Sequence, residues 1–130
     1  DTYTDVYTLS YTTLFRSDRA YAKTLLPPRK EDGHKGDFGK LLVLGGSVSY
    51  TGAPYLAASA AVHSGCGLVY LGVPESIWAV EAQKCVSAMP FPLPETDGRL
   101  CLAALDKIQD KLKGCDVLAL GPGLGRGKET

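Results

Sequence analysis

The sequence lacks any excess of charge, because 14 lysines and arginines balance 14 aspartates and glutamates over 130 residues. General nucleic-acid-binding proteins and polybasic membrane-surface proteins carry a basic excess, so the balance argues against both classes. No stretch reaches the roughly 18 continuous apolar residues of a membrane span, and the N-terminus has no signal-peptide pattern. We therefore expect a cytoplasmic globular protein with no nucleic-acid partner and no membrane partner.

Paired metal- or redox-type cysteines are also missing. No two cysteines have CxxC spacing, and neither His34 nor His63 has a partner at metal-ligand spacing. Each cysteine lies among apolar neighbours, which suits a small structural thiol. We expect free thiols in a reducing compartment and no metal-ligating residue. The four cysteines are Cys66, Cys85, Cys101 and Cys115.

Glycine is absent from the first 32 residues, although the whole chain contains 15 glycines. The same region holds four of the seven tyrosines, and residues 11–17 (YTTLFRS) resemble the in-frame translation of a common sequencing adapter. We expect residues 1–25 to be an artefactual or disordered leader, with a natural disordered leader as the alternative. Residues 26–130 then form the N-terminal part of a domain.

Downstream of residue 30, apolar runs alternate with helical segments. The runs at residues 40–44, 68–71 and 115–120 predict buried parallel strands. Helices are predicted over residues 53–64, 74–85 and 99–113, the last with an apolar face of Leu102, Leu105, Ile108 and Leu112. Residues 89–94 must be extended, because three alternating prolines forbid a helix. The alternation predicts a three-layer α/β/α fold with a mostly parallel sheet, and we expect it to be truncated at its C-terminus because no helix follows the last strand.

Two glycine clusters follow predicted strands, at the ends where open parallel sheets bind ligands. The first is Gly45-Gly46-Ser47, followed by Gly52-Ala53 at a helix start, and the second is the GPGLG run at residues 121–125. Glycine lets the backbone approach a ligand, and a helix N-terminus favours phosphate. Neither cluster has GxGxxG or P-loop spacing, so each alone is also explained by a tight turn. Together they indicate one ligand site.

Five motifs carry a resemblance to a known family. HKGxxG (34–39), GGS (45–47), GAP (52–54) before an alanine-rich helix, SGxGLV (64–69) and DxxxxGPGLGR (116–126) occur in this order. Their order and spacing resemble the N-terminal half of the ADP-dependent NAD(P)H-hydrate dehydratases, from about Leu26 to Gly127. These enzymes belong to the ribokinase-like superfamily, so the resemblance implies that fold.

The resemblance also implies a function, which is repair of nicotinamide cofactors by dehydration of (S)-NAD(P)H hydrate. It implies ADP or ATP with Mg²⁺ as cofactors, and a homo-oligomer for the complete enzyme. Ala53, Gly123 and Gly125 are implied to contact the hydrate. The remaining candidate substrate-binding residues are Gly46, Ser47 and Gly52, with Arg126 as a candidate phosphate contact.

The family's other motifs do not occur in these residues. They are a histidine-bearing loop, a lysine-bearing nucleotide segment and a GDxLAG-type motif with the catalytic aspartate. We therefore assign no catalytic residue and expect the fragment to be inactive and to fold poorly alone. A ribokinase-like small-molecule kinase and a non-catalytic nucleotide-binding module remain alternatives.

Overall fold

The computed structural model describes residues 18–26, 28 and 31–127, and the chain divides into two units, Asp1–Asp32 and Gly33–Thr130. The smaller unit contains the short helix α2 (Arg19–Thr24), which begins after Asp18. The Asp18 carboxylate accepts a hydrogen bond from the backbone N–H of Tyr21 at 2.8 Å, as an N-cap residue does. Residues 11–17 lie outside the described residues, so the interpretation of the leader and the boundary at residue 26 stay predictions.

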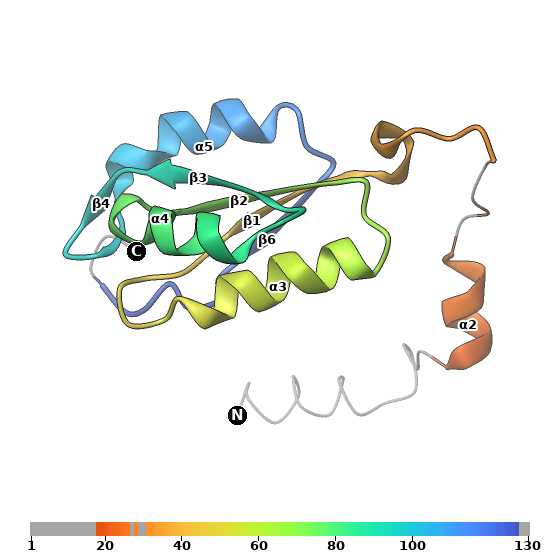
Figure 1. The fold of residues 1–130 in the computed structure, drawn as a ribbon, viewed down its shortest axis with the longest axis horizontal. Helices are drawn as coiled ribbons and strands as arrows, with labels where there is room; N and C mark the ends of the chain where they lie inside the picture. The colour runs from red at the N-terminus through yellow and green to blue at the C-terminus, as the bar shows by residue number, and fades with distance from the viewer. Residues whose placement is uncertain (1–17, 27, 29–30, 128–130) are drawn as a thin grey trace, which may run out of the picture. The chain divides into compact units, whose positions relative to one another are not determined.

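The larger unit is built on a parallel four-stranded sheet in the order β3-β2-β1-β6 (Figure 1). The central strands are β1 (Lys40–Leu44) and β2 (Leu68–Pro74), and the edge strands are β3 (Met89–Leu93) and β6 (Val117–Leu120). All three pairings are parallel. The three predicted parallel strands are confirmed, but the expectation that all three are buried is wrong for the third, β6, whose side chains are largely exposed. The proline-rich extended segment is a fourth strand that the sequence did not assign to the sheet.

Strand β3 tolerates its prolines because it lies at an edge of the sheet. It pairs with β2 on one side only, so the missing N–H groups of Pro90 and Pro92 remove no bond from the ladder. Their carbonyl oxygens accept side-chain hydrogen bonds instead, from the Trp78 indole at 3.1 Å and from the Lys107 ammonium at 2.7 Å. This edge is therefore occupied by side chains from two helices.

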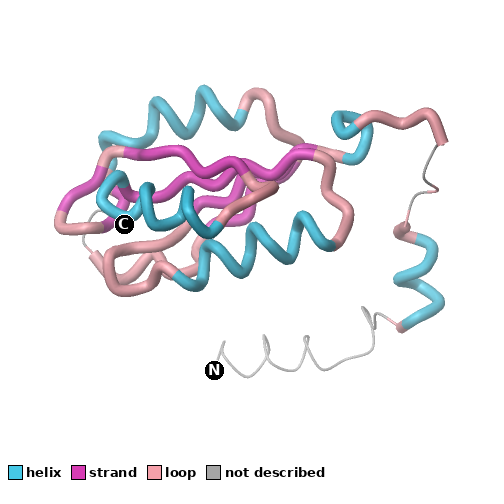
Figure 2. Tube along the Cα trace, in the orientation of Figure 1, coloured by secondary structure: helices cyan, strands magenta, loops and turns pink. Residues whose placement is uncertain are grey.

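Helices cover both faces of the sheet. Helices α3 (Gly52–His63) and α4 (Glu75–Lys84) lie on one face, and α5 (Leu105–Leu112) lies on the other (Figures 1 and 2). The three-layer α/β/α prediction is thus confirmed. In the part of the chain that the structure describes, no helix is long and apolar enough to cross a membrane.

The alternation of side chains along the strands divides the core between the two faces. Val43, Val69 and Leu71 pack with α3 and α4, while Leu42 and Leu44 pack toward α5. All five side chains are buried. Edge strand β6 differs, since Val117, Leu118 and Leu120 are all exposed.

The helix predicted over residues 99–113 is wrong at its start. Residues Arg99–Leu100 form strand β5, paired antiparallel with β4 (Glu95–Thr96), and a 3₁₀ turn, η3 (Leu102–Ala104), precedes α5. The predicted apolar face is correct only in its second half. Ile108 and Leu112 pack against the core, whereas Leu102 and Leu105 are exposed.

Candidate functional site

The two glycine loops meet at the carboxyl ends of β1 and β6. The backbone N–H of Gly46 donates to the carbonyl of Pro122 at 2.8 Å, and the Ser47 hydroxyl donates to the carbonyl of Gly123 at 2.9 Å. The loops can touch because β1 and β6 are paired neighbours, so their carboxyl ends reach the same end of the sheet. The expectation that both clusters contribute to one place in the fold therefore agrees with the geometry.

The loops pack so closely that side chains are excluded from their centre. Gly123 has a φ of +74°, and a Cβ there would lie 2.9 Å from the Tyr50 carbonyl oxygen and 3.2 Å from the Cβ of Ala53. Gly46 has a φ of +82°, and its Cβ would lie 2.9 Å from the Cγ of Pro54 and 2.9 Å from the Cδ1 of Ile77. Both positions thus require glycine for conformation and for space.

A β-hairpin supplies a third wall that the sequence analysis missed. Strands β4 and β5 are joined by Asp97 and Gly98, which both have positive φ, 50° and 71°. A two-residue turn of this kind matches the twist of a hairpin, and Asp-Gly is a preferred pair for it. The carbonyl of Gly98 accepts a hydrogen bond from the Val48 N–H at 3.0 Å, which fixes the hairpin to the first glycine loop. The Asp-Gly pair is the signal in the sequence that indicates this hairpin.

The hairpin places Arg99 beside the second glycine loop. A Cβ on Gly125 would lie 3.0 Å from the Arg99 Nε, so the guanidinium occupies space that a side chain at 125 would need. That Nε is buried and has no hydrogen-bond partner among the described residues. The Arg99 side chain lines a cleft of about 600 Å³. Its lining consists of Tyr50, Arg99, Leu124, Arg126 and the glycines at 121, 123 and 125.

The candidate residues from the sequence take different places around this cleft. Gly123, Gly125 and the candidate Arg126 line it. Ser47 lies beneath the lining through its hydrogen bond to Gly123. Gly52 begins α3, and a Cβ there would have nothing within 4 Å.

Tyr50 and Arg99 are the lining residues that sequence reasoning did not select. Neither belongs to a glycine cluster, and the chain brings them to the cleft from a loop and from a hairpin. Among the described residues, no group of three His, Cys, Asp or Glu side chains fits a metal ion.

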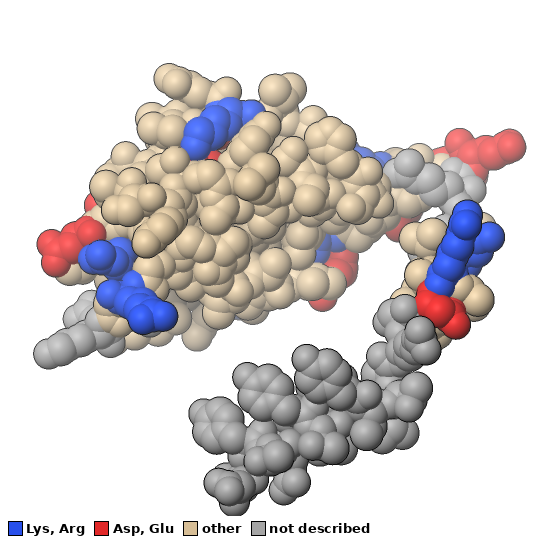
Figure 3. Space-filling view, turned by 90° about the horizontal axis from the view of Figure 1, so that it is seen from below, with Lys and Arg blue, Asp and Glu red and all other residues tan. Residues whose placement is uncertain are grey.

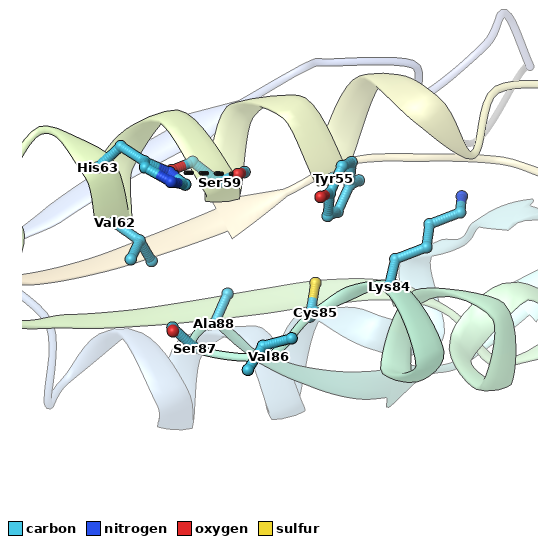
Figure 4. Close-up of a pocket in the computed structure, with 9 residues that line it drawn as sticks. All are labelled: Tyr55, Ser59, Val62, His63, Lys84, Cys85, Val86, Ser87 and Ala88. Atoms are coloured by element: carbon cyan, nitrogen blue, oxygen red, sulfur yellow. Dashed lines mark hydrogen bonds between the residues drawn. The ribbon is translucent and has the colours of Figure 1, made fainter.

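A second, smaller cavity of about 250 Å³ lies between α3 and the end of α4 (Figure 4). Tyr55 and His63 of α3 line one side, and Lys84 and Cys85 line the other. The His63 Nδ1 lies 2.7 Å from the Ser59 carbonyl oxygen, so it is held within its own helix. This cavity receives neither glycine loop, and we therefore place the candidate site at the larger cleft.

The thiol of Cys85 in this cavity gives a prediction. Burial raises the pKa of Cys85 above its ordinary value of 9.0; the nearby Glu81 carboxylate adds to the rise and Lys84 opposes it. Because only the thiolate is alkylated, we expect native Cys85 to react more slowly with iodoacetamide at about pH 8 than the same residue in urea. Because the pKa of Cys85 is higher in the folded chain than in the unfolded chain, the neutral thiol contributes stability at pH values below the unfolded pKa. This contribution is lost as the pH rises through the folded pKa. Peptide mass spectrometry measures the alkylation rate of Cys85 over a pH series in buffer and in urea. The same pH midpoint of the rate in both solvents would contradict the expectation.

The comparisons with known proteins agree on one family. A family model described as NAD(P)H-hydrate dehydratase matches residues 41–130. The bifunctional NAD(P)H-hydrate repair enzyme of Moorella thermoacetica is 45% identical over 112 residues, 85% of this chain and 21% of that protein. The ADP-dependent (S)-NAD(P)H-hydrate dehydratase of Staphylococcus aureus is 36% identical over 100 residues, 77% of this chain and 33% of that protein. The chain thus spans a fifth to a third of the length of these relatives.

Two solved structures share this fold. A hypothetical protein of Streptococcus mutans superposes with a TM-score of 0.69 at 30% identity, over 88% of this chain and 38% of that chain. A ribokinase-like superfamily protein of Enterococcus faecalis gives a TM-score of 0.69 at 22% identity, over 86% of this chain and 36% of that chain. The fold is therefore ribokinase-like, and with the family match over residues 41–130 the chain belongs to the NAD(P)H-hydrate dehydratase family.

Proposed function

We propose that this chain forms the substrate-binding part of an enzyme that dehydrates (S)-NAD(P)H hydrate in a reaction that consumes ADP or ATP. The observation that carries the proposal is the contact of the two glycine loops, through Gly46 with Pro122 and Ser47 with Gly123, at the carboxyl ends of adjacent parallel strands. Open parallel sheets bind their ligands at such ends. The names of the relatives supply the substrate and the nucleotide.

The cleft suits the binding of a phosphorylated ligand with planar rings. Gly123 and Gly125 leave the backbone bare, and Tyr50 offers an aromatic face. We propose that Ala53, Gly123 and Gly125 contact the hydrate, with Gly46, Ser47 and Gly52 supporting the same surface. Gly46 and Ser47 do so through their hydrogen bonds to the second loop.

In this reaction the described residues bind the substrate, and we assign no proton transfer to them. The terminal phosphoryl group passes from ADP, leaving AMP, to the hydrate hydroxyl oxygen, which gives up its proton. That oxygen then leaves as inorganic phosphate, and loss of a proton from the neighbouring ring carbon restores the ring double bond. The described lining of the cleft contains no carboxylate and no histidine, so we assign no general base to it. The folded chain is accordingly expected to bind the hydrate without turning it over. A cooperative urea transition of the unaltered chain would contradict the expectation that it folds poorly alone.

We further propose that Mg²⁺ accompanies the nucleotide and that the complete enzyme is a cytoplasmic homo-oligomer. The described residues include no trio of side chains suited to a metal ion. We therefore assign none of them to Mg²⁺ and derive no step through the ion.

Calorimetric titration of the chain with NADPH hydrate, with and without ADP, tests the proposal. We expect saturable binding, and we expect Gly123→Ala to raise the Kd at least about tenfold, because the left-handed φ and the crowding by Tyr50 deform the loop. Gly114→Ala is the matched control, since a Cβ there meets only the Lys111 carbonyl oxygen at 3.8 Å.

The outcomes separate the alternatives. Absence of binding by the unaltered chain contradicts the proposed function. Equal affinity for NADPH and its hydrate favours a non-catalytic dinucleotide-binding module. Release of inorganic phosphate from ADP with NADPH hydrate would show that the expected inactivity is wrong.

A further inference from the structure

We propose that Arg99 binds a phosphate group of the dinucleotide substrate. This inference rests on the proposed function and adds a recognition residue to its site. It starts from one observation, the buried Nε of Arg99 that has no hydrogen-bond partner among the described residues. A buried donor left without a partner is costly and rare in folded proteins.

No described side chain neutralises this arginine. The ion pairs of the described residues join His34 with Asp37, Lys84 with Glu81 and Lys113 with Asp110, and none includes Arg99. A guanidinium stays charged at any pH that a folded protein tolerates. An anion bound in the cleft would supply both a counter-charge and an acceptor for this buried Nε.

The hairpin holds Arg99 in a defined position. The Asp97–Gly98 turn fixes the geometry of β4 and β5, and the Gly98 carbonyl is bound by the Val48 N–H at 3.0 Å. A Cβ on Gly98 would overlap the side chain of Val48, so the hairpin lies directly on the first glycine loop. Arg99 follows immediately and is carried into the cleft by this attachment. Because the backbone that carries Arg99 is already fixed, no loop has to be ordered when a ligand binds.

The surroundings favour phosphate over other anions. The described cleft lining contains two arginines, Arg99 and Arg126, and no carboxylate. Basic side chains gather at the left end of the larger unit in Figure 3, the end at which the three loops lie in Figure 1, with acidic side chains beside them. The planar fork of a guanidinium matches two phosphate oxygens at once. Gly125 leaves the space that the guanidinium occupies, since a Cβ there would lie 3.0 Å from its Nε.

A dinucleotide hydrate offers such a phosphate in two places. The diphosphate bridge is common to NADH hydrate and NADPH hydrate, whereas the 2′-phosphate occurs only in NADPH hydrate. Titration of the chain with each hydrate distinguishes them. The variants are Arg99→Gln, which removes the charge, Arg99→Lys, which keeps the charge without the fork, and Arg19→Gln on α2 as a control with the same charge change.

We expect Arg99→Gln to raise the Kd by about 10- to 100-fold, because it removes a charge-assisted hydrogen bond. The Kd of Arg99→Lys is expected to lie between those of the unaltered chain and Arg99→Gln. Arg19→Gln is expected to bind as the unaltered chain does. An equal loss for both hydrates assigns Arg99 to the diphosphate bridge, and a loss confined to NADPH hydrate assigns it to the 2′-phosphate.

A stability measurement separates recognition from a structural role. Since the Arg99 Nε has no partner in the described residues, Arg99→Gln should leave the urea midpoint unchanged or raise it. Unchanged affinity for both hydrates in Arg99→Gln overturns the inference, as does an equal loss in Arg19→Gln. A lowered urea midpoint together with weaker binding also overturns it. If the unaltered chain binds neither hydrate, the proposed function itself fails.

Discussion

Replacement of Gly67 by alanine is expected to lower the free energy of unfolding by about 3 kcal/mol, the upper part of the range for overpacking. A Cβ on Gly67 would overlap the carbonyl oxygen of Lys35, lie 2.8 Å from its carbonyl carbon and lie 3.2 Å from the carbonyl oxygen of Gly39. These are backbone atoms of the 3₁₀ turn η2 (Lys35–Phe38) and of the residue after it. They cannot move aside by changing a rotamer.

The turn is also held where it is by hydrogen bonds. The Gly67 N–H donates to the Phe38 carbonyl and the Leu68 N–H donates to the Gly39 carbonyl, each at 3.0 Å. The alanine must therefore break this attachment at the start of β1 and β2. Urea denaturation followed by circular dichroism measures the loss, with Gly114→Ala as the matched control. Equal midpoints for the two variants would contradict the prediction.

Replacement of Lys84 by methionine is the second change with a large expected effect, a destabilisation of about 3–5 kcal/mol. Glu81 is fully buried, and its Oε1 lies 2.9 Å from the Lys84 Nζ. Its second oxygen is buried without a hydrogen-bond partner among the described residues. Lys84 also donates to the Thr51 carbonyl at 3.3 Å, directly before α3. Methionine fills similar space but leaves the carboxylate buried and unpaired.

Two further variants show whether the pair is the cause. Lys113→Met breaks an ion pair of the same i,i+3 spacing, Lys113–Asp110 at 3.0 Å, but both of its side chains are exposed. Its expected effect is below about 1 kcal/mol. Adding Glu81→Gln to Lys84→Met should recover much of the loss, because the buried group is then neutral. Equal denaturation midpoints for Lys84→Met and Lys113→Met, or no recovery in the double variant, would refute the argument.

The sheet was predictable because its strands are short runs that are apolar on both faces. Val43 faces α3 and α4 while Leu42 and Leu44 face α5, and only a strand covered on both sides needs such a run. The membership of β3 was not predictable from its prolines. They forbid a helix, but whether an extended segment joins a sheet depends on the partners found in three dimensions.

The segment around residue 99 shows how periodicity misleads. Leu102, Leu105, Ile108 and Leu112 have helical spacing, which suggested one helix from residue 99. The Asp97–Gly98 turn instead commits Arg99 and Leu100 to a hairpin, and Leu102 and Leu105 remain exposed. A local turn signal outweighed the apolar pattern that followed it.

The candidate site was predictable only where glycine marks it. Glycines at 46, 123 and 125 have positive φ, and the sequence records that requirement directly. Arg99 is one charged residue among many. The Asp97-Gly98 pair before it marks a turn but does not show that Arg99 reaches the cleft. Its buried Nε depends on a hairpin contact between residues 48 and 98, which spacing along the chain does not reveal.

The two edges of the sheet differ in whether they accept another strand. At β3, the prolines offer no donors and Trp78 and Lys107 already bind the outward carbonyls. At β6, apolar side chains are exposed, and its outer side pairs with no described strand. The sheet can therefore accept a further parallel strand beside β6 but not beside β3. The second glycine loop, which follows β6, would then lie inside the enlarged sheet with neighbouring loops on both sides.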